Sequence, residues 1–190
     1  MSPTNLGLMA AFAVLVFWAV GAYNRLIRLK NSIGNSFGPI DVQLKQRYDL
    51  IPNFVEAAKN YLHHERDALD AVMTARNLAR SASDAVRSRP ANARVVRLLA
   101  SAERKLGRSM ARLFAVAKLD AGLRADKTIC ALRDDLKSAE SKVAFACQAY
   151  NDAVLVYNEA QGQFPVVLLA RLFGFSPAAF LKTTPNTRDR

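Results

Sequence analysis

A regular series of small and apolar residues runs through the stretch from Leu132 to Phe164. Successive members lie alternately four and three residues apart, at Leu132, Leu136, Ala139, Val143, Ala146, Tyr150, Ala153, Tyr157, Ala160 and Phe164. Residues with this period lie along one side of an α-helix, and that side must be covered by other helices. The series therefore predicts a long helix in a helical bundle or coiled coil, with an N-cap at Asp126 and an end near Gly162.

Residues 6–23 form an uncharged apolar run that is long enough to cross the roughly 30 Å hydrocarbon layer of a bilayer. No Lys or Arg precedes this run, whereas Arg25, Arg28 and Lys30 follow it. Because positive charge beside a membrane helix tends to stay in the cytoplasm, we expect a retained anchor with its N-terminus outside. Two alternatives are a cleaved signal peptide and a buried core helix.

The apolar pattern continues beyond the membrane segment with spacings of three, four and seven residues. The positions concerned are Leu26, Ile33, Phe37, Ile40 and Leu44. We therefore expect the anchor and the first bundle helix to form one long rod. Pro39 either bends or divides this rod, because proline removes a backbone donor and crowds the preceding turn.

A second helical run follows. Asp49 offers its N-cap, and apolar residues at helical spacing continue to Ala79, with an interruption, if there is one, near His63 and His64. Residues 81–92 contain Ser, Asp, Asn and Pro and predict a connection.

A third run extends from Pro90 to Ala121, with Gly122 at its C-cap. Residues 165–181 are apolar but too short to cross a bilayer, so we expect them to fold over the open end of the bundle. A peripheral contact with the membrane interface is the alternative. Residues 182–190 are polar and predict a loose tail.

The fold class that these runs predict is all-α. Gly and Pro are scarce, and no stretch alternates apolar and polar residues long enough for a half-buried sheet. The expected organisation is an N-terminus and transmembrane anchor in residues 1–23, a cytoplasmic bundle in residues 24–181 and the tail. Cys130 and Cys147 lie about 25 Å apart on one predicted helix, so they cannot pair within a chain, which favours a reducing compartment.

Charge is unevenly distributed along the chain. The net charge is +11, and residues 76–124 alone carry twelve basic and three acidic side chains. On a helical wheel the basic residues cluster on one side, at Arg94, Arg97, Arg104, Lys105, Arg108 and Arg112. A solvated face would ordinarily mix signs, so this face predicts an anionic partner: an acidic protein, the anionic inner leaflet or nucleic acid. Nucleic acid ranks last, because no aromatic residues are interleaved for stacking bases.

The remaining polar candidates favour structural roles. His63 and His64 are adjacent and point about 100° apart, so they cannot bind one metal from the same helix face. Asn151 and Asn158, one heptad apart beside the apolar series, predict a polar layer that fixes helix register, with partners at Arg47, Asp49 and Glu140. The sequence shows no nucleophile and base pair, Gly-rich phosphate loop or metal-ligand spacing, so we expect neither a catalytic site nor a cofactor.

Residues 40–56 read IDVQLKQRYDLIPNFVE and resemble the signature of the LemA family of bacterial membrane-anchored helical proteins. Further similarities are Tyr61, His64-Glu65, Ala75-Arg76, Tyr150-Asn151, Val154, Tyr157-Asn158, Phe164-Pro165 and Phe173-Gly174-Phe175. The resemblance implies a short extracytoplasmic N-terminus, one transmembrane helix and a cytoplasmic antiparallel bundle at the bacterial inner membrane. It implies no catalytic site.

The expected function is that of a non-enzymatic, single-pass membrane scaffold or adaptor whose basic face engages an acidic protein or an anionic lipid. The family resemblance brings two associations: membrane organisation, including magnetosome membranes, and membrane-protein quality control beside membrane proteases. A protease regulator and a membrane-tethered nucleic-acid binder are therefore the alternatives. Homo-oligomerisation is left open.

Overall fold

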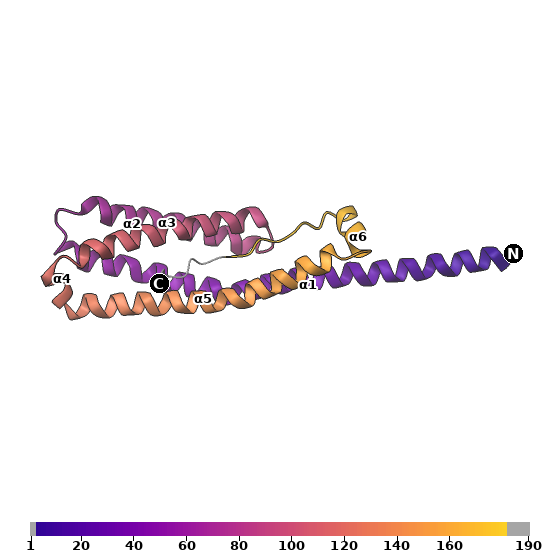
Figure 1. The fold of residues 1–190 in the computed structure, drawn as a ribbon, viewed down its shortest axis with the longest axis horizontal. Coiled ribbons are helices and arrows are strands. Elements are labelled where there is room, and N and C mark those ends of the chain that lie inside the picture. Colours follow the sequence, from indigo (N-terminus) through magenta and orange to yellow (C-terminus); the bar gives the residue numbers. More distant parts are fainter. Residues whose placement is uncertain (1–2, 182–190) are drawn as a thin grey trace, which may run out of the picture.

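The computed structural model describes residues 3–181, which form six helices and no strand. The first, α1 (Pro3–Lys59), is a single rod of 57 residues. Its N-terminal part projects alone from one end of the molecule, and its C-terminal part is embedded in a helical bundle (Figure 1). The predicted all-α fold, with a long N-terminal apolar helix continuing into a bundle, is confirmed.

The prolines of α1 do not divide it, and Asp49 is not an N-cap. Pro39 and Pro52 both lie inside the helix. Proline at position 52 leaves the carbonyl of Tyr48, four residues earlier, without its usual helical donor. Nε of Arg76, from the next helix, donates a hydrogen bond of 2.9 Å to that carbonyl oxygen. A neighbouring side chain thus replaces the missing bond, and the helix continues.

The second helix, α2 (Arg66–Ser88), follows a short break that contains His63 and His64, where the sequence pattern allowed an interruption. The helix extends further than predicted, into residues 81–92. Ser83 and Val86 are buried on its inner side, so this polar stretch still has a face that packs against the bundle. The connection to the next helix shrinks accordingly.

The third helix, α3 (Ala93–Ala117), begins at an N-cap formed by Asn92, whose side chain accepts hydrogen bonds from the backbone N–H groups of Arg94 and Val95. It ends earlier than predicted. Gly122 lies in a separate short helix, α4 (Ala121–Ala125), which Asp120 caps. A Cβ at Gly122 would lie 3.1 Å from Cε1 of Tyr61, so the absence of a side chain lets the tyrosine ring approach closely.

The long helix of the apolar series, α5 (Lys127–Gly162), has the predicted start and end. The side chain of Asp126 accepts hydrogen bonds from the backbone N–H groups of Thr128 and Ile129. The series is buried or half-buried from Leu132 to Ala160. Phe164 departs from the pattern: it lies beyond the helix end and is 81% exposed.

Within the bundle, α1 packs along α5 and α2, and α2 packs along α3. Edge-on aromatic contacts join Phe37 to Tyr150 across the α1–α5 interface and Phe54 of α1 to Phe114 of α3. The last helix, α6 (Val166–Leu172), packs on the side of α1 at the end of the bundle nearest the projecting rod, and the chain then runs back along the bundle (Figure 1).

Residues 165–181 therefore cover the bundle end only in part. Ala170 of α6 joins a small apolar cluster with Leu26 and Ala160 on the flank of the rod. Ser176 and Pro177 line a groove at the α2–α3 turn. The predicted tail, residues 182–190, lies outside the described residues.

Candidate interaction surface

The predicted basic residues of α3 form one exposed face. We call this set the α3 basic face; its members are Arg94, Arg97, Arg104, Lys105, Arg108 and Arg112. The opposite side of α3 is buried through Val96, Leu99, Leu106, Met110 and Leu113. Within residues 3–181 none of the six cations forms an ion pair. Their charge is thus available to a partner.

Glu103 is the only acid on α3, and it does not dilute the basic face. Its side chain is buried, 7% exposed, and points toward α1. Oε1 accepts a hydrogen bond of 2.5 Å from the Tyr48 hydroxyl, and Oε2 lies 2.9 Å from Nη1 of Arg47. The surface of α3 is therefore more uniformly positive than the sequence count suggested.

The cluster of Arg47, Tyr48 and Glu103 joins α1 to α3. Burial of the ring and the adjacent charge of Glu103 raise the pKa of Tyr48, so the phenol stays protonated and remains a donor. A buried carboxylate is tolerated only when it is paired and hydrogen-bonded, as here. Sequence reasoning missed Glu103, although its spacing from Leu99 and Leu106 places it on the apolar side of the helix.

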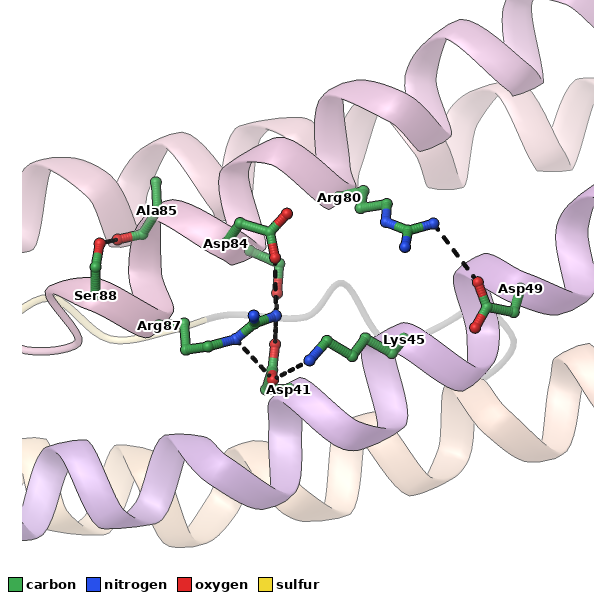
Figure 2. A network of polar contacts seen from close by, with 9 residues as sticks. Asp41, Lys45, Asp49, Arg80, Asp84, Ala85, Arg87 and Ser88 are labelled. Carbon is green, nitrogen blue, oxygen red and sulfur yellow. Dashed lines mark hydrogen bonds and ion pairs between the residues drawn. The ribbon is translucent and has the colours of Figure 1, made fainter.

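A second polar cluster joins α1 to α2 around Asp41 (Figure 2). Its carboxylate accepts two hydrogen bonds from Arg87, at 3.0 and 2.9 Å, and lies 2.9 Å from Nζ of Lys45. Burial raises the pKa of Asp41, but the hydrogen bonds from Arg87 and Lys45 outweigh it and hold that pKa below its usual value. Asp84 also pairs with Arg87, at 2.8 Å.

The five residues expected to form one polar layer are not brought together. Arg47 belongs to the buried cluster with Glu103. Asp49 is exposed and lies 3.5 Å from Arg76 and 3.7 Å from Arg80, the latter visible in Figure 2. Glu140 is exposed on α5. The layer fails because Arg47 faces α3, whereas Asn151 and Asn158 face the returning C-terminal segment.

Asn151 and Asn158 bind backbone. The Asn158 amide donates to the Ala178 carbonyl at 3.0 Å and accepts from the Ala178 N–H at 2.9 Å. The Asn151 amide does the same at Leu181, at 3.2 and 2.9 Å. These four hydrogen bonds give partners to the backbone N–H and C=O groups of Ala178 and Leu181, which lie in a segment without regular secondary structure. Because Asn151 and Asn158 are one heptad apart, they lie on the same side of α5 and hold this segment along the helix.

The histidines and cysteines make no cluster. His63 and His64 are exposed, and the described part of the chain holds no group of three side chains that could bind a metal ion. Cys130 is half-buried and Cys147 is buried, both as thiols.

The projecting part of α1 is long and apolar enough to cross a membrane. Its large side chains, among them Phe12, Leu15 and Phe17, are exposed and make no core. This favours a membrane helix over the buried core helix considered from the sequence. A cleaved signal peptide, the other alternative considered from the sequence, has the same length and composition and stays open.

A protein-family model described as the LemA family matches residues 36–190. The chain belongs to the LemA family. The LemA match begins at Ser36, so it covers the bundle and leaves the projecting apolar part of α1 outside it. No curated protein matches the chain.

Proposed function

We propose that this LemA-family protein is a non-enzymatic scaffold or adaptor, anchored by the N-terminal part of α1 in the bacterial cytoplasmic membrane. The N-terminus lies outside and the bundle in the cytoplasm, because Arg25, Arg28 and Lys30 follow the apolar run. The observation that carries the proposal is the α3 basic face, whose six cations have no acidic partner among residues 3–181.

The direction of α3 supports the proposal of an acidic protein, rather than an anionic lipid, as the partner. Three contacts order α3 along α1: Pro90, just before α3, lies beside Gly34, Glu103 bonds to Tyr48, and Phe114 contacts Phe54. In these three pairs the residue numbers increase in the same order on both helices, so α3 runs parallel to α1 and away from the anchor.

The distal part of the basic face is therefore far from the membrane. At about 1.5 Å per residue, Gly34 lies about 16 Å beyond Tyr23, the last residue of the apolar run, and Arg112 lies about 27 Å further along than Arg94. Headgroup charge is screened within about 8 Å at physiological salt. If α1 spans the bilayer, Arg108 and Arg112 lie beyond the range of the headgroup charge. A protein partner, in contrast, can contact the whole α3 basic face.

A groove extends the proximal end of this face. It has a volume of about 1110 Å³ and is lined by Lys30 of α1, Arg89, Arg94 and Arg97, with no acidic side chain. An acidic segment of a partner protein fits such a groove, because its carboxylates would meet unpaired guanidinium groups that bind them in a bidentate manner.

The buried polar groups support a structural role for the rest of the bundle. Arg47, Tyr48 and Glu103 bond to one another, and Asp41 bonds to Arg87, so each set is engaged in holding helices together. Groups engaged in this way are poorly placed to act on a substrate.

The test is photo-crosslinking in living cells from a residue within the basic face. A photoreactive amino acid at Ser101, which is exposed between the two ends of the face, should give a discrete adduct with an acidic protein. The variant Arg104→Glu/Arg108→Glu/Arg112→Glu should abolish the adduct. The matched control Lys127→Glu/Lys137→Glu/Lys142→Glu places the same charge change on exposed residues of α5 and should retain it.

The result distinguishes the candidate roles. An adduct that both variants lose, or that neither loses, contradicts recruitment by the basic face. A membrane protease as the captured protein would select the alternative role in quality control, and a nucleic-acid adduct would select tethered nucleic-acid binding.

A further inference from the structure

The end of the bundle nearest the anchor exposes large apolar side chains on and around α6. Phe164 is 81% exposed, Leu168 59%, Leu172 77% and Phe173 55%. We call these four residues the α6 apolar face. A soluble protein rarely leaves several large apolar residues adjacent and exposed unless they meet another surface.

The position of α6 along the rod identifies that surface. The ring of Phe173 lies 5.0 Å from the ring of Tyr23, edge-on, and the ring of Phe175 lies 5.6 Å from it. Val166, at the start of α6, lines a cavity together with Trp18 and Ala22. The helix therefore lies at the level where the apolar run of α1 ends.

This level is the membrane interface if α1 spans the bilayer. Trp and Tyr gather at the boundary between the hydrocarbon and the headgroups, as Trp18 and Tyr23 would. Since α6 contacts the rod at these same residues, it cannot lie outside the headgroup layer. Arg25 and Arg171, both exposed, would extend their charged ends toward the headgroups.

We propose that the α6 apolar face is a second membrane contact, buried at the boundary between headgroups and acyl chains. Short apolar faces of this kind enter the interface by about 5–10 Å. The contact rests on the proposed membrane anchoring of α1. It would restrict rotation of the bundle about the axis of α1, because α6 adds a membrane contact on one side of the rod.

The returning segment keeps α6 in place. Tyr157 donates from its hydroxyl to the Ser176 carbonyl at 3.1 Å, and Asn158 bonds to both backbone groups of Ala178. Both residues belong to α5, which itself packs along α1. The helix α6 is therefore held beside the rod by α5, which precedes it, and by the hydrogen-bonded segment that follows it.

The test uses nitroxide spin labels on the full chain in nanodiscs of phosphatidylethanolamine and phosphatidylglycerol. Cys130→Ala/Cys147→Ala provides the background, and single cysteines replace Leu168, Leu172, Leu15 or Leu119. The spin relaxation of each label measures its accessibility to oxygen, which concentrates in lipid, and separately to a water-soluble nickel chelate. The Leu168→Cys and Leu172→Cys labels should be more accessible to oxygen than to nickel. The Leu119→Cys label, on a leucine that is 85% exposed at the far end of the bundle, should show the reverse.

The Leu15→Cys label separates the two proposals. If it is accessible to nickel, α1 is not in the bilayer and the anchoring itself fails. If Leu15→Cys is in lipid while Leu168→Cys and Leu172→Cys are accessible to nickel, the α6 contact alone is refuted. Labels at 168 and 172 that are shielded from both reagents would also overturn it, because a second protein surface then covers the face.

Discussion

Nε of Arg76 lies 2.9 Å from the carbonyl oxygen of Tyr48, the oxygen that Pro52 leaves without a helical donor. One side chain of α2 thereby repairs a gap in the backbone of α1. The same guanidinium lies 3.5 Å from Asp49 through Nη2. The arrangement explains how the rod continues to Lys59 through a residue that ordinarily ends or kinks a helix.

A double-mutant cycle tests this repair. Arg76→Met should lower the free energy of unfolding by about 1–2 kcal/mol, because the half-buried carbonyl loses its donor. In a Pro52→Ala background, where the backbone N–H returns, the same substitution should cost clearly less. Urea unfolding followed by circular dichroism on the full chain in detergent measures both. Equal costs in the two backgrounds would refute the repair.

The buried pair of Arg47 and Glu103 predicts strong non-additivity. Glu103→Leu alone leaves the Arg47 guanidinium buried without its partner and should cost about 3 kcal/mol of stability. Arg47→Met/Glu103→Leu should recover part of that loss, because a well-packed apolar pair often replaces a buried ion pair at little cost, while the Tyr48 hydroxyl lacks its acceptor in both variants. The same unfolding experiment reads it out. A double variant as unstable as the sum of the single variants would contradict the pairing.

The lowered pKa of Asp41 predicts a loss of stability in acid. Because the folded state holds this pKa below the unfolded value of about 3.9, Asp41 stabilises the fold above that pH, and the contribution disappears as pH falls through the folded-state pKa. The stability difference between the wild type and Asp41→Asn should therefore be full at neutral pH and shrink below about pH 4. Asp134→Asn, at an exposed position of α5, serves as the control and should show no such trend. A difference that does not change between pH 7 and pH 3 would contradict the ion-pair account.

The side-chain amides of Asn151 and Asn158 on α5 are expected to hold the C-terminal segment, residues 176–181, in place. Asn151→Ala/Asn158→Ala removes four hydrogen bonds to the backbone at Ala178 and Leu181. The amide protons of Ala178 and Leu181 should then exchange with deuterium much faster, while those of α5 keep their protection. Asn53→Ala, at an exposed position on α1 away from this segment, should leave both unchanged. Unchanged exchange in the double variant would show that apolar packing alone holds the segment.

The sequence predicted the fold class, the continuous rod and the limits of α5, because these follow from the period of apolar residues and from a good N-cap at Asp126. It misjudged Asp49 as an N-cap, since Asp is common at helix starts, whereas Asp49 lies inside α1. The donor that lets the helix continue comes from Arg76, 24 residues after Pro52, and no local pattern reveals it.

The site residues divide in the same way. The α3 basic face follows from a helical wheel, and all six of its residues are exposed. The polar layer does not form, because a wheel shows which side of α5 Asn151 and Asn158 occupy but not which segment covers it. Residues 176–181 have no helical period of their own, so their place along α5 depends on tertiary hydrogen bonds.

The most direct test of the account is the topology of the chain in intact cells. In the Cys130→Ala/Cys147→Ala background, a membrane-impermeant maleimide is applied to cells that carry Asn5→Cys or Leu119→Cys, both at exposed positions. The account predicts that Asn5→Cys is labelled in intact cells and that Leu119→Cys is labelled only after the membrane is permeabilised. Labelling of Leu119→Cys in intact cells would place the bundle outside the cytoplasm and contradict the account.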